Sequence, residues 1–333
     1  MTMLRILAIH WFDEALKRIL SGMGYEIRLI YGVPKCVFID GCRKDWDIIY
    51  YASFIPPYLK DLRIILNKKA RVVYGTHTPL YIKHMYRPTH ILHNMFSLMK
   101  TLYAERNPHF TIHSINQLEY NILKRYFRRV YYIPLGVDTE KYTPKKKYDR
   151  FTVLFSGPRY QKGADLLPYI VPKLVEKIPD IRFLLAGIGF YTKIYKELRQ
   201  RYPENIVIGI DLPHDEFREA LYRSHVLLFP SRFEGCPRIV LEALSCGTVI
   251  VGFRVPGVQA IDIVDRVNAG HICSYPDVYC LMKGIARMHA LWRNDPEKYY
   301  ALSKRSREIA VGFDWRKLAP YYDQMFRSII VER

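Results

Sequence analysis

The sequence is poor in cysteine. Its 333 residues include six cysteines, and no two of them form a Cys-x-x-Cys pair or stand at the spacing of a zinc site. The length and composition exclude a small disulfide-stabilised domain, and the spacing of the cysteines gives no zinc-binding motif. We therefore expect the cysteines to be the reduced thiols of an intracellular protein.

Long apolar runs are also lacking. No stretch approaches 18 consecutive apolar residues, so the sequence predicts no membrane-spanning helix. Near the amino terminus, the short apolar run Ile6–Ile9 is soon followed by the charged residues Asp13 and Glu14. A run this short with acidic residues behind it predicts a first β-strand rather than a signal peptide.

Acidic residues are few relative to basic ones. The chain holds 32 Asp and Glu against 51 Lys and Arg, which gives a net charge of +19 and a pI near 9.6. Most of this surplus lies in residues 1–150, which hold 25 basic and 12 acidic side chains. So large a surplus predicts an anionic partner, and a nucleic acid, a membrane surface and a phosphorylated substrate all remain open.

Half of the residues are hydrophobic, and the length suits two domains of roughly 150 residues each. Both halves alternate short apolar runs with segments of helical periodicity, which is typical of parallel sheets covered by helices on both faces. The predicted strands are residues 4–10, 25–31, 47–52, 71–75, 110–114, 130–134, 151–156, 181–186, 205–209, 225–230, 249–252 and 271–273. The charged, proline-containing segment 142–150 is predicted to link two α/β domains.

Candidate binding residues lie in loops that follow predicted strands of the second half, where open α/β sheets bind ligands. In the first loop, Gly157 and Gly163 permit a tight turn, and Arg159 and Lys162 add two cations. Glycines and cations before a helix are typical of a diphosphate-binding loop. A surface turn with two solvated cations explains the same residues equally well.

A second loop contains Gly187 and Gly189 directly after a predicted strand. Glycines here allow a ligand to approach the backbone closely. Tight packing between strand and helix explains this Gly-x-Gly pattern equally well, so the pattern alone assigns no function.

A third loop carries the strongest signal. Glu234 follows a buried strand, a helix is predicted to begin near Pro237, and Glu242 lies about two turns along that helix. Two carboxylates directed at one cleft suit a hydroxyl-rich ligand, because each can accept paired hydrogen bonds from vicinal hydroxyls. An isolated Glu-x7-Glu spacing is usually an ordinary solvated helix, but here it follows a strand-end loop.

These motifs resemble the retaining glycosyltransferases of family 4. The resemblance extends to the segments 133–144, 213–235, 255–261 and 313–326. It implies the GT-B fold, an α/β architecture of two Rossmann-like, doubly wound domains that face each other across a cleft. The implied domains are an acceptor-side domain, residues 1–141, and a donor-binding domain, residues 150–313, with residues 314–333 packing back on the first.

The resemblance also implies roles for individual residues. Arg159 and Lys162 would hold the donor diphosphate and stabilise the leaving nucleotide, Glu242 would bind the ribose hydroxyls, and Glu234 would lie near the donor hexose. The implied catalytic residues are His77, Arg159, Lys162 and Glu234, and the implied donor-binding residues are Gly157, Gly187, Gly189, Gly235, Cys236 and Glu242. Pro237 lacks a backbone N–H where many relatives have glycine, although the Glu-Gly-x-Pro variant also occurs in the family.

The first domain matches the family less well. Relatives often have a Gly-Gly loop after the first strand, whereas residues 10–13 of this chain contain no glycine. His77, after a predicted strand, resembles the family histidine that approaches the transferred sugar, although a structural histidine fits the position too. Asp45 and Asp47 mimic an Asp-x-Asp metal motif, but Asp47 opens a predicted strand. We read it as a cap or loop residue and predict no essential metal.

The resemblance implies transfer of a sugar with retention of anomeric configuration, by front-side displacement rather than through a glycosidase-like carboxylate pair. The donor would be a UDP- or GDP-linked sugar, with no separate cofactor, and the acceptor a glycan, a lipid-linked glycan or a protein glycan. Two alternatives remain open: a basic nucleic-acid-binding protein, which has no recognisable motif here, and an inactive sugar-nucleotide-binding relative.

Residues 80–106 interleave apolar, aromatic and basic side chains. Such a segment suits an anionic membrane surface that presents lipid-linked acceptors. A pair of core-facing helices with a solvated basic face is the other interpretation. We expect a cytoplasmic protein, and a peripheral position at the inner membrane surface depends on this segment.

Overall fold

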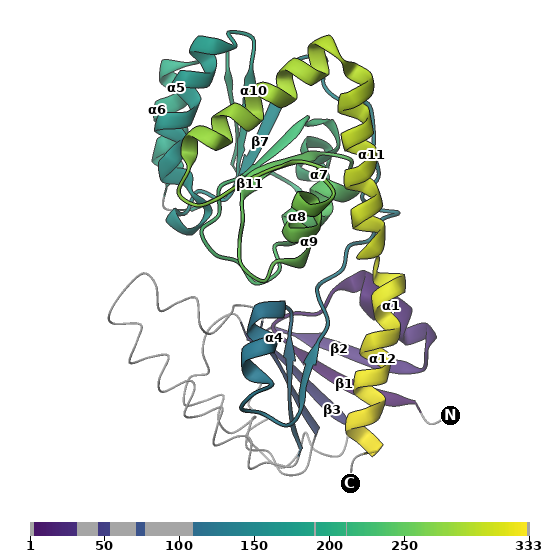
Figure 1. Ribbon diagram of the computed structural model, residues 1–333. Helices are drawn as coiled ribbons and strands as arrows, with labels where there is room; N and C mark the ends of the chain where they lie inside the picture. Colours follow the sequence, from purple (N-terminus) through teal and green to yellow (C-terminus); the bar gives the residue numbers. More distant parts are fainter. Residues whose placement is uncertain are drawn as a thin grey trace, which may run out of the picture. The chain divides into compact units, whose positions relative to one another are not determined.

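The computed structural model describes residues 3–31, 46–53, 71–76, 109–189, 191–210 and 212–331. The chain divides into two compact units. Unit 1 comprises Met1–Gly136 and Trp315–Arg333, and unit 2 comprises Val137–Asp314. Figure 1 shows the elements of both units.

Unit 1 is built on a six-stranded parallel sheet of order β2-β1-β3-β4-β5-β6. Its strands are β1 (Leu4–Ile9), β2 (Tyr25–Ile30), β3 (Ile48–Ser53), β4 (Arg71–Thr76), β5 (Phe110–Ser114) and β6 (Val130–Tyr132). Its described α-helices are α1 (Glu14–Gly22), α4 (Gln117–Leu123) and α12 (Trp315–Val331). The strand order reverses direction between β1 and β3, so this reversal point lies at the loop that follows β1.

The two faces of this sheet have separate cores. On one face, α12 runs beside α1 (Figure 1), and its Phe326 packs against Tyr25 of β2 and Tyr50 of β3 with ring centroids 5.9 and 6.2 Å apart. On the other face, Leu123 of α4 packs in a cluster with Ile112 of β5 and other strand residues. Strands buried on both faces need apolar side chains in both directions, which is why they read as near-continuous apolar runs.

Unit 2 contains a second six-stranded parallel sheet, of order β12-β11-β10-β7-β8-β9. Its strands are β7 (Thr152–Ser156), β8 (Arg182–Ala186), β9 (Ile206–Gly209), β10 (Val226–Phe229), β11 (Val249–Phe253) and β12 (His271–Cys273). Its α-helices are α5 (Leu167–Lys177), α6 (Thr192–Arg201), α7 (His214–Arg223), α8 (Arg238–Ser245), α9 (Gln259–Arg266), α10 (Val278–Asn294) and α11 (Pro296–Gly312). Two short 3-10 helices, η4 (Tyr160–Lys162) and η5 (Ala164–Leu166), precede α5.

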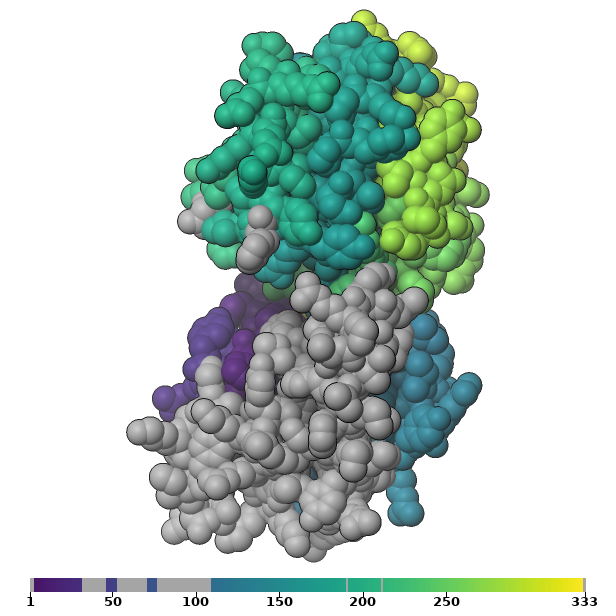
Figure 2. Space-filling view, turned by 90° about the vertical axis from the view of Figure 1, so that its left-hand side faces the viewer, coloured from purple at the N-terminus to yellow at the C-terminus, as the bar shows by residue number. Residues whose placement is uncertain are grey.

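Helices cover both faces of the second sheet. One core cluster joins the sheet to α5, α6 and α10, and the other joins it to α7, α8 and α9 on the opposite face (Figure 1). Figure 2 looks onto the side of α5 and α6, where teal residues form the surface of unit 2. The strand order is that of the dinucleotide-binding fold, with the reversal between β7 and β10. Every predicted strand corresponds to an observed strand.

The predicted linker differs from the observed boundary. The units divide between Gly136 and Val137, and the segment 142–150 is part of unit 2. Lys147 lies in this segment and is buried, and its Nζ donates to the carbonyls of Tyr222 and Cys246 and to Thr248 Oγ1 at 2.9–3.3 Å. A run of lysines is ordinarily solvated, so composition alone could not show that three oxygen atoms bury one of them.

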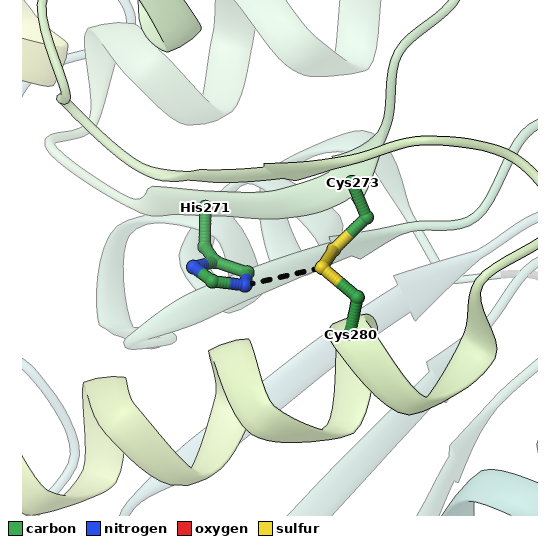
Figure 3. A group of neighbouring side chains, drawn as sticks. All are labelled: His271, Cys273 and Cys280. Carbon is green, nitrogen blue, oxygen red and sulfur yellow. Dashed lines mark hydrogen bonds between the residues drawn. A yellow bond between two sulfur atoms is a disulfide. The ribbon is translucent and has the colours of Figure 1, made fainter.

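The prediction of reduced cysteines is wrong for one pair. Cys273, at the end of β12, and Cys280, in the first turn of α10, form a disulfide with their Cα atoms 5.9 Å apart (Figure 3). His271 Nε2 lies 3.4 Å from Cys280 Sγ. Cys236 and Cys246 are free thiols, and Cys36 and Cys42 lie outside the described residues. The β12–α10 turn brings the pair together, and a spacing of seven residues does not reveal it.

Within the described ranges, no helix has both the length and the apolar character needed to cross a bilayer.

Candidate active site

The candidate site lies where the strand order of unit 2 reverses. β7 and β10 are neighbours in the sheet, with Val153 paired to Val226. The chain leaves these two strands toward different faces of the sheet, to α5 after β7 and to α8 after β10. In open α/β sheets, ligands bind at the strand ends where the order reverses in this way. The loops that follow β7 and β10 contain Lys162 and Glu234.

The loop after β7 approaches the end of β10 very closely. Gly163 has a φ of +80°, and a Cβ atom there would lie 2.5 Å from the carbonyl oxygen of Pro230. Gly157 has a φ of +105°, and the side chain of Lys162 occupies the space beside its Cα. Glycine is therefore required at both positions for its positive φ and because a Cβ atom would collide with a neighbouring group. Arg159 directly precedes the first 3-10 turn and is exposed, and Lys162 is the last residue of that turn and is partly buried.

The loop after β10 places its carboxylates in buried positions. Glu234 is 7% exposed and Glu242 is 9% exposed, although neither is a core residue type. Helix α8 begins at Arg238, which confirms the predicted start near Pro237, and Pro237 precedes it with extended backbone angles. Glu242 lies on the second turn of this helix, as the spacing predicted.

The two loops meet through their charged groups. Lys162 Nζ donates to Glu234 Oε1 at 2.5 Å, and the side chains are 23% and 9% exposed. Because the pair is largely buried, its charges are weakly screened. The structure thus brings together two of the four residues predicted to be catalytic, across 72 positions of sequence.

Glu242 has its own charged and polar neighbours. Its Oε1 lies 3.4 Å from the guanidinium of Arg238, one helical turn earlier. The Tyr142 hydroxyl is also close, and its pKa is raised mainly by burial and further by the Glu242 carboxylate. Sequence reasoning missed Tyr142 because it assigned residues 142–150 to a linker.

Gly187 and Gly189 lie in the loop after β8, beside the loop after β7. A Cβ atom at Gly189 would lie 2.8 Å from the carbonyl oxygen of Pro158, and one at Gly187 would lie 3.3 Å from the Pro158 ring. Close packing of two loops accounts for both glycines. This is a packing role, as in the alternative considered from the sequence, but the partner is the loop after β7 and not a helix. Their predicted role in a nucleoside pocket stays a prediction, as do the roles of Gly235 and Cys236.

Unit 1 places fewer of the predicted residues. His77 and Asp45 lie outside the described residues. Asp47 lies directly before β3 and accepts a hydrogen bond from the Arg5 backbone N–H at 2.8 Å, so it has the structural role expected for it. At the position where relatives often have glycines, His10 adopts a φ of +72°, which glycine would adopt without strain.

The described residues contain one cluster of three side chains of metal-ligating type, His271, Cys273 and Cys280. The two sulfur atoms form the disulfide of Figure 3, and a disulfide lacks the thiolates that bind metal ions. The cluster lies at β12 and α10, not in the loops after β7 and β10. The prediction that no metal is essential stays a prediction.

Three comparisons with known proteins bear on this site. The profile of the family described as Glycosyl transferases group 1 matches residues 150–290. A human phosphatidylinositol N-acetylglucosaminyltransferase protein is 29% identical over 205 residues, which cover 60% of this chain and 41% of the human protein. The Arabidopsis thaliana protein of the same name is 32% identical over 165 residues, which cover 48% and 36%. The matched regions thus span less than half the length of these curated relatives.

Solved structures resemble the whole chain. Sucrose-phosphate synthase from Thermosynechococcus elongatus has a TM-score of 0.78 at 16% identity and covers 99% of this chain and 100% of its own. HepE from Anabaena in complex with UDP and glucose has a TM-score of 0.69 at 15% identity and covers 98% and 100%. At these identities the structures establish the fold. The chain has the GT-B fold, and the segment that carries the candidate site, residues 150–290, belongs to the Glycosyl transferases group 1 family.

Proposed function

We propose that this protein is a glycosyltransferase that moves a sugar from a nucleoside-diphosphate sugar to an acceptor hydroxyl with retention of anomeric configuration. The observation that carries the proposal is the meeting of Lys162 and Glu234 at the reversal point of a dinucleotide-binding sheet. This site lies inside the segment that matches the glycosyltransferase family. A cation for phosphate and a carboxylate for hydroxyls are the two groups that such a donor requires.

The proposed reaction breaks the bond between the anomeric carbon and the diphosphate oxygen. The bonding electrons leave with the nucleoside diphosphate, and negative charge develops on its terminal phosphate. Arg159 and Lys162 stabilise that charge, which is the largest change during the reaction. The acceptor oxygen bonds to the anomeric carbon on the face that the phosphate leaves, and its proton passes to the departing phosphate oxygen.

The remaining donor contacts follow from the positions of the carboxylates. Glu234 accepts hydrogen bonds from hexose hydroxyls, and the backbone N–H groups of Gly235 and Cys236 donate hydrogen bonds to hexose oxygens. Glu242 binds the ribose hydroxyls from the second turn of α8. Positive charge for the diphosphate comes from side chains in this proposal, so transfer proceeds in the presence of a chelator.

Two variants and a surface control test this assignment. Binding of UDP, GDP and ADP to the whole protein is measured by calorimetry, followed by product analysis with the corresponding sugar nucleotides. Glu242→Ala and Lys162→Ala should each weaken nucleotide binding at least tenfold, whereas Lys193→Ala, an 85% exposed residue of α6, should bind as the wild type does. Full transfer activity in Lys162→Ala would overturn the assignment, as would a wild-type protein that binds none of the nucleotides.

For the acceptor, we propose a lipid that presents an inositol or related hydroxyl at an anionic membrane surface. Two observations support this choice. The curated relatives above are named as phosphatidylinositol N-acetylglucosaminyltransferases. Residues 1–150 carry 25 basic against 12 acidic side chains, a surplus far larger than one diphosphate requires. A peripheral position at the cytoplasmic membrane surface is part of this proposal, and residues 80–106, which lie outside the described ranges, are its sequence candidate.

Flotation with vesicles tests the membrane-binding part of the acceptor proposal independently of the donor, and a transfer assay tests the acceptor itself. The protein should float with vesicles that contain phosphatidylinositol and stay in the soluble fraction with neutral phosphatidylcholine vesicles. It should also transfer radiolabelled sugar to the lipid fraction. Equal soluble fractions with both vesicles, or transfer only to soluble glycans, would reject the lipid acceptor while leaving the donor assignment intact.

A further inference from the structure

Arg232 lies between the two donor loops but is not one of the residues that the donor would touch. It belongs to the loop after β10, two residues before Glu234, and its side chain is only 4% exposed. The side chain extends away from its own loop toward the loop after β7. No role was predicted for it from the sequence.

The guanidinium of Arg232 forms a planar, two-pronged pair with Asp165. One amino group donates to Asp165 Oδ1 and the other to Oδ2, each at 2.8 Å. Such bidentate pairs fix orientation as well as distance, which a lysine in the same place cannot do. Asp165 belongs to η5, directly after Gly163, so this pair joins the two loops.

The same side chain also contacts Tyr160, which begins the turn that carries Lys162. Arg232 Nη1 donates to the Tyr160 carbonyl, and the guanidinium lies over the Tyr160 ring, 3.8 Å from its centroid. Its two amino groups are therefore engaged within the protein. This arrangement makes Arg232 unsuited to bind a donor directly and suited to hold the loop that does.

Two further hydrogen bonds, one between backbone groups and one from a side chain, join the same two loops. The Arg232 N–H donates to the Gln161 carbonyl at 2.9 Å, and Gln161 Nε2 donates to the Phe233 carbonyl at 2.9 Å. Together with the Asp165 pair, these bonds connect the loop that contains Lys162 to the loop that contains Glu234.

When the donor binds, only contacts that do not involve Lys162 can keep the two loops joined. Without donor, Lys162 and Glu234 pair with each other at 2.5 Å. In the proposed reaction, Lys162 turns to the diphosphate and Glu234 to the hexose, so their mutual pair no longer joins the loops. We propose that Arg232 is a positioning residue, which through Asp165 and Tyr160 holds the diphosphate-binding loop and the hexose-binding loop in their catalytic spacing. This inference rests on the proposed donor site.

The test compares Arg232→Gln, Arg232→Lys and the wild type in calorimetric titrations of the full chain with UDP, GDP and ADP. Arg232→Gln should bind the nucleotide that the wild type prefers about tenfold more weakly, and kcat/KM with the matching sugar nucleotide should fall roughly 10- to 100-fold. Arg232→Lys should lie between the two, because it keeps the charge and loses the bidentate geometry. Asp165→Asn combined with Arg232→Gln should be no worse than Arg232→Gln alone, since both changes remove one interaction.

The matched control is Arg218→Gln, which removes another arginine–carboxylate pair of unit 2, with Asp215 at 2.6 Å, that lies within helix α7 and does not join the two loops. It should leave Kd and kcat/KM within twofold of the wild type. The binding stoichiometry separates positioning from folding. Positioning predicts one site per molecule with a weaker Kd, whereas a purely structural role predicts fewer sites with an unchanged Kd.

Two results would contradict the proposal in distinguishable ways. If the wild type binds a nucleotide and Arg232→Gln keeps its Kd and kcat/KM within twofold, or loses only stoichiometry, then Arg232 has no positioning role and the proposed function stands. If the wild type binds none of the three nucleotides, then the proposed function fails, and the positioning role fails with it.

Discussion

At the scale of single residues, Lys162 and Glu234 illustrate how a binding site is kept ready by its own charges. Burial of an isolated charge is costly, and the two side chains offset that cost by pairing with each other. Removing either side chain therefore leaves the other as a buried charge without its partner. Substitution of Lys162 leaves the Glu234 carboxylate where a diphosphate would approach. The effects of substituting Lys162 and Glu234 on nucleotide binding should therefore not be additive.

Lys162→Ala should weaken UDP binding more than the double variant Lys162→Ala with Glu234→Gln does. We expect a loss of about 2–3 kcal/mol in the single variant, which is on the order of 30- to 150-fold in Kd, and recovery of roughly tenfold in the double variant. The physical reason is that neutralising Glu234 removes the repulsion between its carboxylate and the phosphate. Calorimetric titration measures both constants, and a double variant as weak as the single one would rule out this repulsion.

His113 provides a pH dependence for unit 1. The side chain is fully buried between Tyr50, whose hydroxyl lies 2.8 Å from Nδ1, and the Ile133 carbonyl, and burial lowers its pKa to about 4. The unfolded chain has a histidine pKa near 6.5, so between pH 6.5 and 4 the unfolded state binds more protons than the native state. Stability is therefore lost as the pH falls through this window.

Between pH 7.5 and pH 5, this residue should lower the free energy of unfolding of unit 1 by about 2 kcal/mol. Urea unfolding at the two pH values measures the difference. His113→Gln is the control, because it removes the titrating group whatever its effect on stability. Between pH 7.5 and pH 5, the variant should lose about 2 kcal/mol less of its free energy of unfolding than the wild type does. An equal pH dependence in both proteins would show that His113 does not titrate in this window.

At the scale of elements, the strands were predicted correctly, and the errors of prediction lie in the loops and turns. Near-continuous apolar runs located every strand, because a strand buried on both faces needs apolar side chains at almost every position. Residues 142–150 were misread because their charge is typical of linkers, whereas Tyr142 contacts Glu242 and Lys147 is buried. The Cys273–Cys280 disulfide was missed for a related reason, since it depends on the direction in which α10 leaves β12.

Cys280→Ser should lower the free energy of unfolding of unit 2 by about 2 kcal/mol. The disulfide closes a loop with a sequence separation of seven, and loop-closure entropy for so short a loop is of this size. Denaturant unfolding of the wild type in dithiothreitol should give the same loss, while Cys280→Ser should be insensitive to the reductant. A wild-type protein whose stability does not change with reductant would contradict the prediction.

At the scale of the whole molecule, the chain leaves unit 1 at Gly136 and returns to it at Trp315. The crossing segments lie together within unit 2, where Val137 pairs with Asp314 and Thr139 donates to the Asp314 carboxylate. Helix α12 then completes the core of unit 1, with Trp315, Tyr322 and Phe326 buried. The final residues of the chain thus stabilise its first strands.

Phe326→Ala should destabilise unit 1 by about 3–5 kcal/mol, because it opens a cavity among Tyr25, Tyr50 and Tyr322. Hydrogen exchange resolved by peptide should show faster exchange in β2 and unchanged exchange in β10 of unit 2. Tyr321→Ala is the matched control, because Tyr321 is 59% exposed on the same helix. Equal protection of β2 in the wild type and in Phe326→Ala would refute the role assigned to α12.

The sequence by itself determined the strands, the two α/β units and the three strand-end loops, because these depend on local apolar periodicity and on glycine, proline and carboxylate spacing. It also indicated Lys162 and Glu234 separately. The tertiary structure decided that Lys162 and Glu234 meet, that Arg232 joins their loops through Asp165, that Lys147 is buried, and that Cys273 bonds to Cys280. Each of these depends on contacts between segments distant along the chain or on the direction of a turn, and composition and periodicity carry no information about either.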